Sequence, residues 1–401
     1  MIMKQKVVLA YSGGLDTTYC ALYLKNELNL DVHAVIVQTG GFSSEELQQI
    51  EKRALSLGVS SFKVVDVTQQ YYESCIKYLV YGNVLKNAVY PLSVSAERML
   101  QAIAVADYVK EVGADFVAHG STGAGNDQVR FDMIFQSAIP HVKILTPIRD
   151  NRLSREEEIE YLKSNGVEMN FEKAQYSINK GLWGTSVGGK ETLSSNGYLP
   201  EAAWPTQVTS EEATEIVLHF TEGQLTGINE QTDLNPVVAI QQLQAIAQPF
   251  GIGRDVHVGD TIIGIKGRVG FEAAAPLIII KAHHLLEKHT LTKWQMYWKD
   301  QLSTWYGNWL HEGMMLDPTM RNVECFMEDT QQQVTGKVFI TLHPYRFVVT
   351  GIDSENDLMN SKFGSYGEIN NTWNGDDVKG FAKIFGNQVA IYHAINNKTK
   401  A

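Results

Sequence analysis

Alternation of apolar runs with helical segments is the feature that most limits the fold of the first 167 residues. Short apolar, β-branched runs are separated by segments whose apolar residues recur with a helical period. Strands that are apolar along their whole length belong in a parallel sheet covered on both faces. We therefore expect a doubly wound α/β domain with ligands at the carboxyl ends of its strands. The expected strands are residues 6–11, 31–38, 62–67, 114–120 and 141–147, and the expected helices are residues 17–28, 44–57, 69–80, 95–112 and 154–164.

The second half of the chain has a mixed pattern. After about residue 170, strand-like and helix-like segments no longer alternate regularly, which is typical of an α+β arrangement. The stretch NKGLWGTSVGGKETLSSNG, residues 179–197, is rich in Gly and Ser and predicts a long loop over a site or between domains. Strands are expected within 217–231, 252–272 and 334–351, and helices near 236–248, 273–289 and 292–313.

Composition restricts the kind of protein rather than its fold. The 401 residues include 34 Lys and Arg against 45 Asp and Glu, and the net charge of −11 weighs against a nucleic-acid partner. Cys20, Cys75 and Cys325 are far apart and form no metal-binding or redox motif. The sequence contains no run of 18 apolar residues, so we expect no membrane span. We therefore expect a cytoplasmic protein that acts on small molecules, with no nucleic-acid or membrane partner.

The first expected strand runs into the sequence LAYSGGLDTTYC, which predicts an anion site. Gly13 and Gly14 let the backbone approach an anion closely, and the following helix directs its free N–H groups to the same place. Hydroxyl groups flank the glycines, and Asp16 either caps the helix or helps to hold a phosphate-bound Mg²⁺. A glycine turn in a protein without nucleotide is the alternative. Because the Walker A spacing and its Lys are absent, the loop is not a Walker A loop.

A second polar loop follows the strand expected at residues 114–120. In AHGSTGAGNDQVRF, residues 118–131, glycines open the backbone and hydrogen-bonding side chains surround them. A solvated turn that caps the next helix through Asn126 or Asp127 accounts for one or two of these side chains, but not for all of them. Both loops lie at the same edge of a parallel sheet, so we expect a substrate site beside the anion site.

Both loops resemble those of one enzyme family. The segment YSGGLDT, residues 11–17, is similar to the pyrophosphate loop of the PP-loop ATP pyrophosphatases. Together with HGSTGAGNDQVRF, residues 119–131, it resembles argininosuccinate synthase. Similar segments lie at residues 85–99, 143–150, 175–186, 251–272 and 335–351, so the resemblance spans essentially the whole chain. It implies an adenine nucleotide alpha-hydrolase-like domain over residues 1–168, a synthetase and oligomerisation domain over residues 169–385, and a C-terminal tail over residues 386–401.

The resemblance also implies a reaction. In that family a ureido oxygen of citrulline attacks the α-phosphate of ATP, and the amine of aspartate then displaces AMP to give argininosuccinate. Pyrophosphate is released, Mg²⁺ is bound with the phosphates, and no metal is held by the protein alone. Asp16 and Asp127 would be the catalytic residues, with Asp127 orienting the amine. A homotetramer is expected.

Site residues carried over from the family form three sets. ATP would contact Ala10, Tyr11, Ser12, Gly13, Gly14, Leu15, Asp16, Thr17, Thr18, Val37 and Gly120. Citrulline would contact Tyr90, Ser95, Asn126, Arg130, Ser177 and Ser186, and aspartate would contact Thr122, Asn126 and Asp127. Arg130 suits the citrulline carboxylate because a guanidinium can bind both oxygens at once.

Two positions depart from the family pattern at the amino-acid end of citrulline. Gly259 stands where the family has an acidic residue, and Phe271 stands where it has Tyr. Losing a carboxylate that faces an ammonium weakens binding of that ammonium. Either Asp255, Asp260 or a water takes over this role, or the acceptor is an N-acylated citrulline that uses the room left by glycine. A PP-loop enzyme with another acceptor and a non-enzymatic nucleotide-binding protein are the remaining alternatives.

Two further segments stand out. An extra acidic residue, Glu97, precedes Arg98 in the segment that resembles the citrulline site. The Trp and Tyr cluster of residues 294–309 has helical spacing, and we expect it in the core or at a subunit interface.

Overall fold

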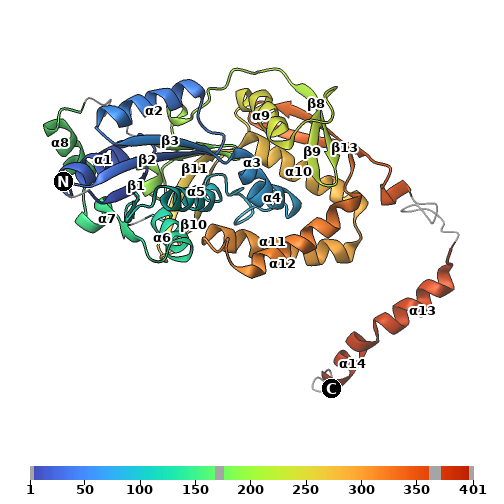
Figure 1. The fold of residues 1–401 in the computed structure, drawn as a ribbon. Helices are drawn as coiled ribbons and strands as arrows, with labels where there is room; N and C mark the ends of the chain where they lie inside the picture. Colours follow the sequence, from blue (N-terminus) through green and yellow to red (C-terminus); the bar gives the residue numbers. More distant parts are fainter. Residues whose placement is uncertain (1–3, 124, 168–175, 361–371, 397–401) are drawn as a thin grey trace.

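A parallel sheet forms the centre of the first domain. The computed structural model describes residues 4–123, 125–167, 176–360 and 372–396 (Figure 1). Five strands pair in parallel in the order β3-β2-β1-β4-β5, which confirms all five expected strands. They are β1 (Lys6–Ala10), β2 (Asp31–Gln38), β3 (Ser61–Asp66), β4 (Phe116–Ala118) and β5 (Lys143–Leu145).

Successive residues of β1 point to opposite faces of the sheet, so each face has its own core. Val7 and Leu9 pack in a cluster with α1 (Leu15–Asn26) and α8 (Arg155–Ser164). Val8 packs in the cluster that includes α5 (Glu97–Val112). Because helices cover both faces of a parallel sheet, the doubly wound α/β fold is confirmed.

The remaining helices of this domain lie between its strands or after the last of them. α2 (Ser44–Ser56) and α8 both begin with a capping box, in which a Ser and the Glu three residues later accept hydrogen bonds from each other's backbone N–H groups. In place of the single helix expected at 69–80, the chain forms α3 (Thr68–Tyr71), a π-helical turn (Tyr72–Ile76) and α4 (Lys77–Tyr81). α6 (Asp127–Ala138) follows β4, and α7 (Pro147–Asn151) follows β5.

Two antiparallel sheets of four strands organise the second half. One has the order β10-β11-β7-β6 and the other has the order β13-β12-β8-β9. The first contains β6 (Ser177–Gly181), β7 (Gly184–Gly188), β10 (Arg254–Asp260) and β11 (Lys266–Glu272). The second contains β8 (Thr214–Thr221), β9 (Gln224–Ile228), β12 (Gly336–His343) and β13 (Arg346–Asp353).

The prediction of a long loop at residues 179–197 was wrong in its first part. This part forms the hairpin of β6 and β7, and β7 also pairs with β11. The turn of the hairpin buries Trp183 completely, and its indole N–H donates to the carbonyl oxygen of Pro91 at 2.9 Å. A Gly- and Ser-rich sequence has little strand propensity of its own, so pairing and the anchored Trp decide the structure.

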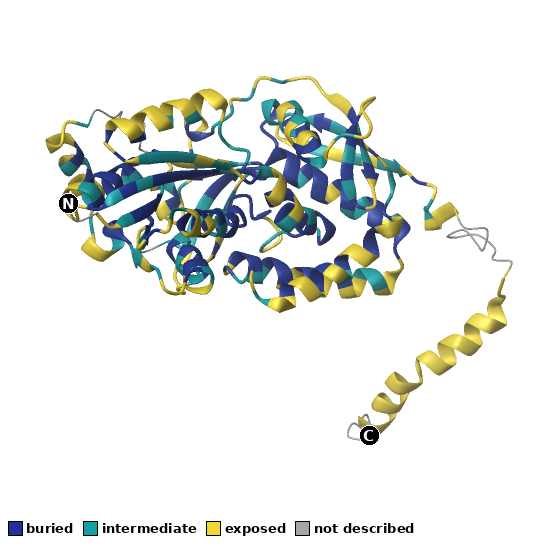
Figure 2. Ribbon diagram, viewed as in Figure 1, coloured by how far each residue is buried: buried dark blue, intermediate teal, exposed yellow. Residues whose placement is uncertain are grey.

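Helices complete the second half. The three expected helices are confirmed as α9 (Pro236–Ala247), α10 (Ala274–Thr290) and α11 (Lys293–His311), whereas α12 (Pro318–Thr330) was not predicted. Beyond the main body lie α13 (Gly375–Phe385) and α14 (Asn387–Asn396), and every residue of both is exposed (Figures 1 and 2). The described part of the expected tail at 386–401 therefore contains the helix α14. The expected domain boundary at 168/169 lies outside the described residues.

The aromatic cluster of α11 is divided between core and surface. Tyr306 is completely buried, whereas Trp294, Tyr297, Trp298 and Trp305 are each more than half exposed. The expectation of a core position is therefore wrong for these four side chains, and the expectation of a subunit interface stays a prediction.

Candidate functional site

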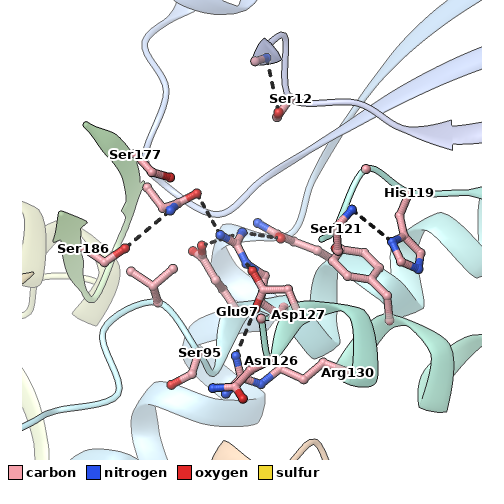
Figure 3. Close-up of a pocket in the computed structure, with 18 of the residues that line it drawn as sticks. Ser12, Ser95, Glu97, His119, Ser121, Asn126, Asp127, Arg130, Ser177 and Ser186 are labelled. Carbon is pink, nitrogen blue, oxygen red and sulfur yellow. Dashed lines mark hydrogen bonds and ion pairs between the residues drawn. The ribbon is translucent and has the colours of Figure 1, made fainter. Parts of the chain in front are cut away.

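A cleft of about 1020 Å³ opens where the strand order of the parallel sheet reverses. β1 and β4 are neighbours, and the chain leaves their carboxyl ends in opposite directions, which is where α/β sheets bind ligands. The loops after both strands line the cleft, and the opposite wall comes from β6, β7, β10 and β11 (Figure 3). The cleft therefore lies at the expected position of the site.

The loop after β1 is shaped to leave backbone amide groups free at the start of α1. Gly13 has a φ of +75°, and Arg53 donates to its carbonyl oxygen at 2.7 Å. Thr18 Oγ1 donates to the carbonyl oxygen of Gly14 at 2.7 Å, so that hydroxyl turns away from the cleft. No side chain caps α1 at Gly14. Its first N–H groups are therefore available to an anion.

Two carboxyl groups lie close together behind this loop. Asp16 of α1 lines the cleft, and Glu158 of α8 is buried. Burial, followed by the charge of Asp16, raises the pKa of Glu158 to about 8. Glu158 therefore keeps its proton at neutral pH and adds no negative charge next to the expected phosphates.

The loop after β4 is held by the helix that it precedes. Gln128 Nε2 donates to the carbonyl oxygens of Gly123 at 2.6 Å and Gly125 at 3.2 Å. Asn126 Oδ1 accepts from the backbone N–H of Ile262 at 2.8 Å. This last bond joins the α/β domain to the β10–β11 hairpin, so the two walls of the cleft are fastened together.

A chain of charges crosses the middle of the cleft. Arg98 donates to Glu97 at 3.1 Å, to Asp127 at 3.0 Å and to Asn179 at 2.9 Å. Arg130 donates to the other oxygen of Asp127 at 3.0 Å and to the carbonyl oxygen of His311 at 2.7 Å. Figure 3 shows Glu97, Asp127 and Arg130 gathered below the phosphate loop.

The two carboxylates of this row of charges, Glu97 and Asp127, differ in their ionisation. Burial raises the pKa of Glu97 to about 7, although Arg98 and the hydroxyl of Thr39 act against that rise. Burial also raises the pKa of Asp127, but Arg98 and Arg130 together bring it below its ordinary value. Asp127 is therefore the permanent anion of the pair.

An aromatic wall closes the end of the cleft that lies away from the phosphate loop. Tyr90 stacks on His257 with ring centroids 4.8 Å apart, and Phe271 lies against Tyr90 at 5.2 Å. A side chain at Gly259 would begin 2.6 Å from His257 Nε2, so the imidazole fills the space beside this glycine. We expected Gly259 to leave extra room for the substrate. This expectation was wrong for the space that a Cβ atom of residue 259 would occupy, because His257 fills it.

Comparison with known proteins identifies this arrangement. Residues 6–168 match the arginosuccinate synthase N-terminal HUP domain, and residues 176–392 match the arginosuccinate synthase C-terminal domain. The argininosuccinate synthases of Methanocaldococcus jannaschii and Dictyoglomus turgidum are 35% and 36% identical, each over 97% of this chain and 98% of the relative. That of Xanthomonas campestris pv. campestris is 34% identical over the same shares.

The chain belongs to the argininosuccinate synthase family. As a member of this family, the protein is an ATP-using ligase of arginine biosynthesis with a PP-loop. In the described ranges no helix is long and apolar enough to cross a membrane.

Most of the residues expected from the argininosuccinate synthase resemblance line this one cleft. All of the citrulline and aspartate residues do so. Gly13, Leu15 and Thr18 are not on its wall: Gly13 shapes the turn, Leu15 is in the core, and Thr18 bonds to Gly14. The residues of the ATP set that line the cleft are Ala10, Tyr11, Ser12, Gly14, Asp16, Thr17, Val37 and Gly120. Their individual roles remain predictions.

Other lining residues were not identified as site residues from the sequence. Arg98 and Asn179 hold the centre of the cleft, and His257 and His311 lie at its far end. Arg98 could have been found, because it lies within the segment that resembles the family's citrulline site. Nothing in the sequence marks a single His in β10 or at the end of α11.

Proposed function

We propose that this protein joins citrulline to aspartate at the expense of ATP, giving argininosuccinate, AMP and pyrophosphate. The observation that carries the proposal is that the loops of β1 and β4 open into the same cleft. One supplies free helical N–H groups for phosphates, and the other supplies Asn126, Asp127 and Arg130 for amino-acid substrates. A PP-loop enzyme with another acceptor is disfavoured by the family match along nearly the whole chain.

The first step activates the ureido group. A lone pair of the ureido oxygen attacks the α-phosphorus of ATP, the bond from this phosphorus to the bridging oxygen breaks, and its electron pair leaves with pyrophosphate. The free N–H groups after Gly14 receive that pyrophosphate. A neutral ureido carbon is a poor electrophile, and adenylation gives it a leaving group.

The second step forms the carbon–nitrogen bond. Aspartate loses a proton, and its amine attacks the ureido carbon. The bond between that carbon and the AMP oxygen breaks, its electron pair leaves with AMP, and the attacking nitrogen loses a second proton as the guanidinium forms. Asp127, which is bonded to Arg98 and Arg130, would accept a hydrogen bond from the amine and orient its lone pair.

Mg²⁺ fits the phosphate end by the chemistry of its donors. Asp16 offers a carboxylate and Ser12 and Thr17 offer hydroxyls on the cleft wall, which suits an ion that takes one or two carboxylates plus phosphate oxygens. Within the described residues no group of three or more His, Cys, Asp or Glu side chains could hold a metal ion. Phosphate-bound Mg²⁺ would neutralise part of the phosphate charge there.

Release of pyrophosphate tests the proposed function. The assay contains ATP, aspartate and a ureido acceptor, with each omitted in turn. We expect sustained release over many turnovers only when all three are present, together with a stoichiometric amount of AMP and of a product that contains both amino acids. Release without aspartate and acceptor, or none with any ureido acceptor, would contradict the proposal.

We also propose a cytoplasmic homotetramer. Its support is the unpaired apolar surface of α11, α13 and α14, where Trp298 and Phe385 are 63% and 77% exposed. Burial of such side chains between subunits removes apolar area from water. Light scattering of the full chain at several concentrations measures the mass, and a monomer at all of them would contradict the tetramer.

A further inference from the structure

The far end of the cleft contains no carboxylate that is free to bind an ammonium. Five carboxylates line the cleft, and two of them, Asp16 and Glu46, stand at the phosphate end. Glu97 and Asp127 are both bonded to Arg98, and Asp127 is bonded to Arg130 as well. Asp260 lies 2.7 Å from Lys266 Nζ. Every lining carboxylate outside the phosphate end is therefore already paired with a cation.

The two acidic neighbours of Gly259 do not take its place. Asp255 is exposed, does not line the cleft, and accepts a hydrogen bond from the backbone N–H of Val256. Asp260 is mostly exposed as well as paired. His257, not an acid, occupies the position into which a side chain at residue 259 would grow.

Two cations, Lys86 and Arg130, act on the imidazoles at this end. Lys86 is half-buried, with its ammonium 3.1 Å from Asn308 Oδ1, and Arg130 is buried beside His311. Burial, followed by the charge of Lys86, lowers the pKa of His257 to about 4. Burial and then the charges of Arg130 and Lys86 lower the pKa of His311 to about 3. Both imidazoles are neutral, mainly because they are buried, and the same cations that add to this effect would also repel an ammonium.

Two polar groups at this end have no partner of their own. Ser95 Oγ is buried without a hydrogen bond. Within the described chain, the ring nitrogens of His257 make no hydrogen bond either, although the ring stacks on Tyr90. A hydroxyl and a neutral imidazole can each donate or accept, so both can pair with the N–H and C=O of an amide.

We propose that the acceptor is a citrulline whose α-nitrogen is acylated, so that an uncharged amide rather than an ammonium lies beside His257 and Gly259. This inference rests on the proposed function, and it changes only the substrate. The ureido group and the carboxylate that faces Arg130 are the same in both acceptors, so the adenylation and displacement steps stand unchanged.

Comparison of three acceptors tests the inference. kcat/KM is measured by pyrophosphate release for citrulline, N-acetylcitrulline and N-succinylcitrulline with saturating ATP and aspartate. We expect at least one acylated acceptor to exceed citrulline by about tenfold or more, since one unpaired buried charge distinguishes them. A higher value for N-succinylcitrulline than for N-acetylcitrulline would show that the cations also bind the extra carboxylate.

The outcomes separate this inference from the proposed function. Aspartate-dependent turnover that is as fast or faster with free citrulline overturns the inference and supports the proposed function. Turnover of acylated acceptors alone supports the inference and the two reaction steps of the proposed function, with the N-acylated acceptor and product in place of citrulline and argininosuccinate. No turnover of any acceptor overturns both.

A matched pair of variants gives an independent test. Because His257 blocks residue 259, both variants carry His257→Ala, and they differ only in Gly259→Glu or Gly259→Gln. We expect the ratio of kcat/KM for citrulline to that for the better acylated acceptor to be about tenfold higher in the Glu variant, because it supplies a counter-charge for the ammonium. Both values come from one preparation, so partial unfolding cancels. Equal ratios in the two variants would contradict the inference.

Discussion

The two ends of the cleft are built in different ways. The phosphate loop comes from one continuous stretch, in which β1 ends at Ala10 and α1 begins at Leu15. The acceptor end is assembled from separate segments that supply Tyr90, Arg130, His257 and Gly259. The phosphate end therefore works through backbone amides, which tolerate many side chains, whereas the acceptor end works through side chains. A change of substrate is easier to make at the acceptor end, where the proposed change of acceptor lies.

The largest effect is expected for Asp127→Asn. The change leaves the mostly buried cations Arg98 and Arg130 without their shared anion, and it removes the acceptor that is expected to orient the attacking amine. We expect kcat/KM for aspartate to fall roughly a hundredfold to a thousandfold. Asp260→Asn is the matched control, because Asp260 lines the same cleft in an exposed pair, and it should change kcat/KM by no more than a few-fold. A large effect of Asp260→Asn on the acceptor alone would instead assign Asp260 to substrate binding.

Glu97→Gln should change how stability depends on pH. The pKa of Glu97 is raised from 4.5 to about 7 in the folded protein, so the folded state binds more protons than the unfolded state between these values. The free energy of unfolding therefore falls as the pH rises from about 4.5 to 7, and ionisation of Glu97 accounts for a fall of roughly 3 kcal/mol.

Urea unfolding at pH 5 and pH 8 measures this difference. The Gln variant should gain stability relative to the original chain at pH 8 and gain much less at pH 5. The exposed Glu160→Gln provides the control. Parallel pH profiles for Glu97→Gln and the original chain would show that Glu97 ionises at its ordinary pH.

Gly13→Ala should weaken ATP binding by about tenfold, since an L side chain at positive φ costs about 1–2 kcal/mol. The residue has a φ of +75°, and its new methyl group would lie 3.1 Å from Ile50 Cγ1. The loop can relieve this strain only by moving the amides that face the phosphates. Gly113→Ala is the control, because its φ is +60° in open space at the end of α5. Calorimetric titration with ATP should show weaker binding for Gly13→Ala only, and equal effects of the two changes would place the cause outside the loop.

The smallest effect is expected for Ser177→Ala. This hydroxyl is exposed on β6, and loss of one neutral hydrogen bond costs about 1 kcal/mol, or a few-fold in KM for the acceptor. Ser186→Ala should have a somewhat larger effect, because Ser186 is buried and its hydroxyl also accepts from Asn179 at 3.4 Å. Steady-state kinetics with varied acceptor measures both, and KM for ATP should not change in either variant.

Much of this molecule could be predicted from its sequence, and the failures have physical causes. The strands of the parallel sheet and the start of α8 were predicted because apolar runs and a capping Ser act locally. The β6–β7 hairpin was missed because Trp183 and the pairing with β11 stabilise it, and neither is a local property. α12 was missed although it begins at a Pro after the capping residue Asp317.

The sequence by itself predicted an anion site at the phosphate end, since Ser12, Gly13 and Gly14 follow one another between a strand and a helix. The resemblance to the family also marked Gly259 and Phe271 as positions that differ from the family pattern. Only the tertiary structure decided what those departures mean. Packing places His257 beside Gly259 and pairs Asp260 with Lys266, and these contacts join residues whose electrostatic effects depend on distance and burial rather than on sequence spacing.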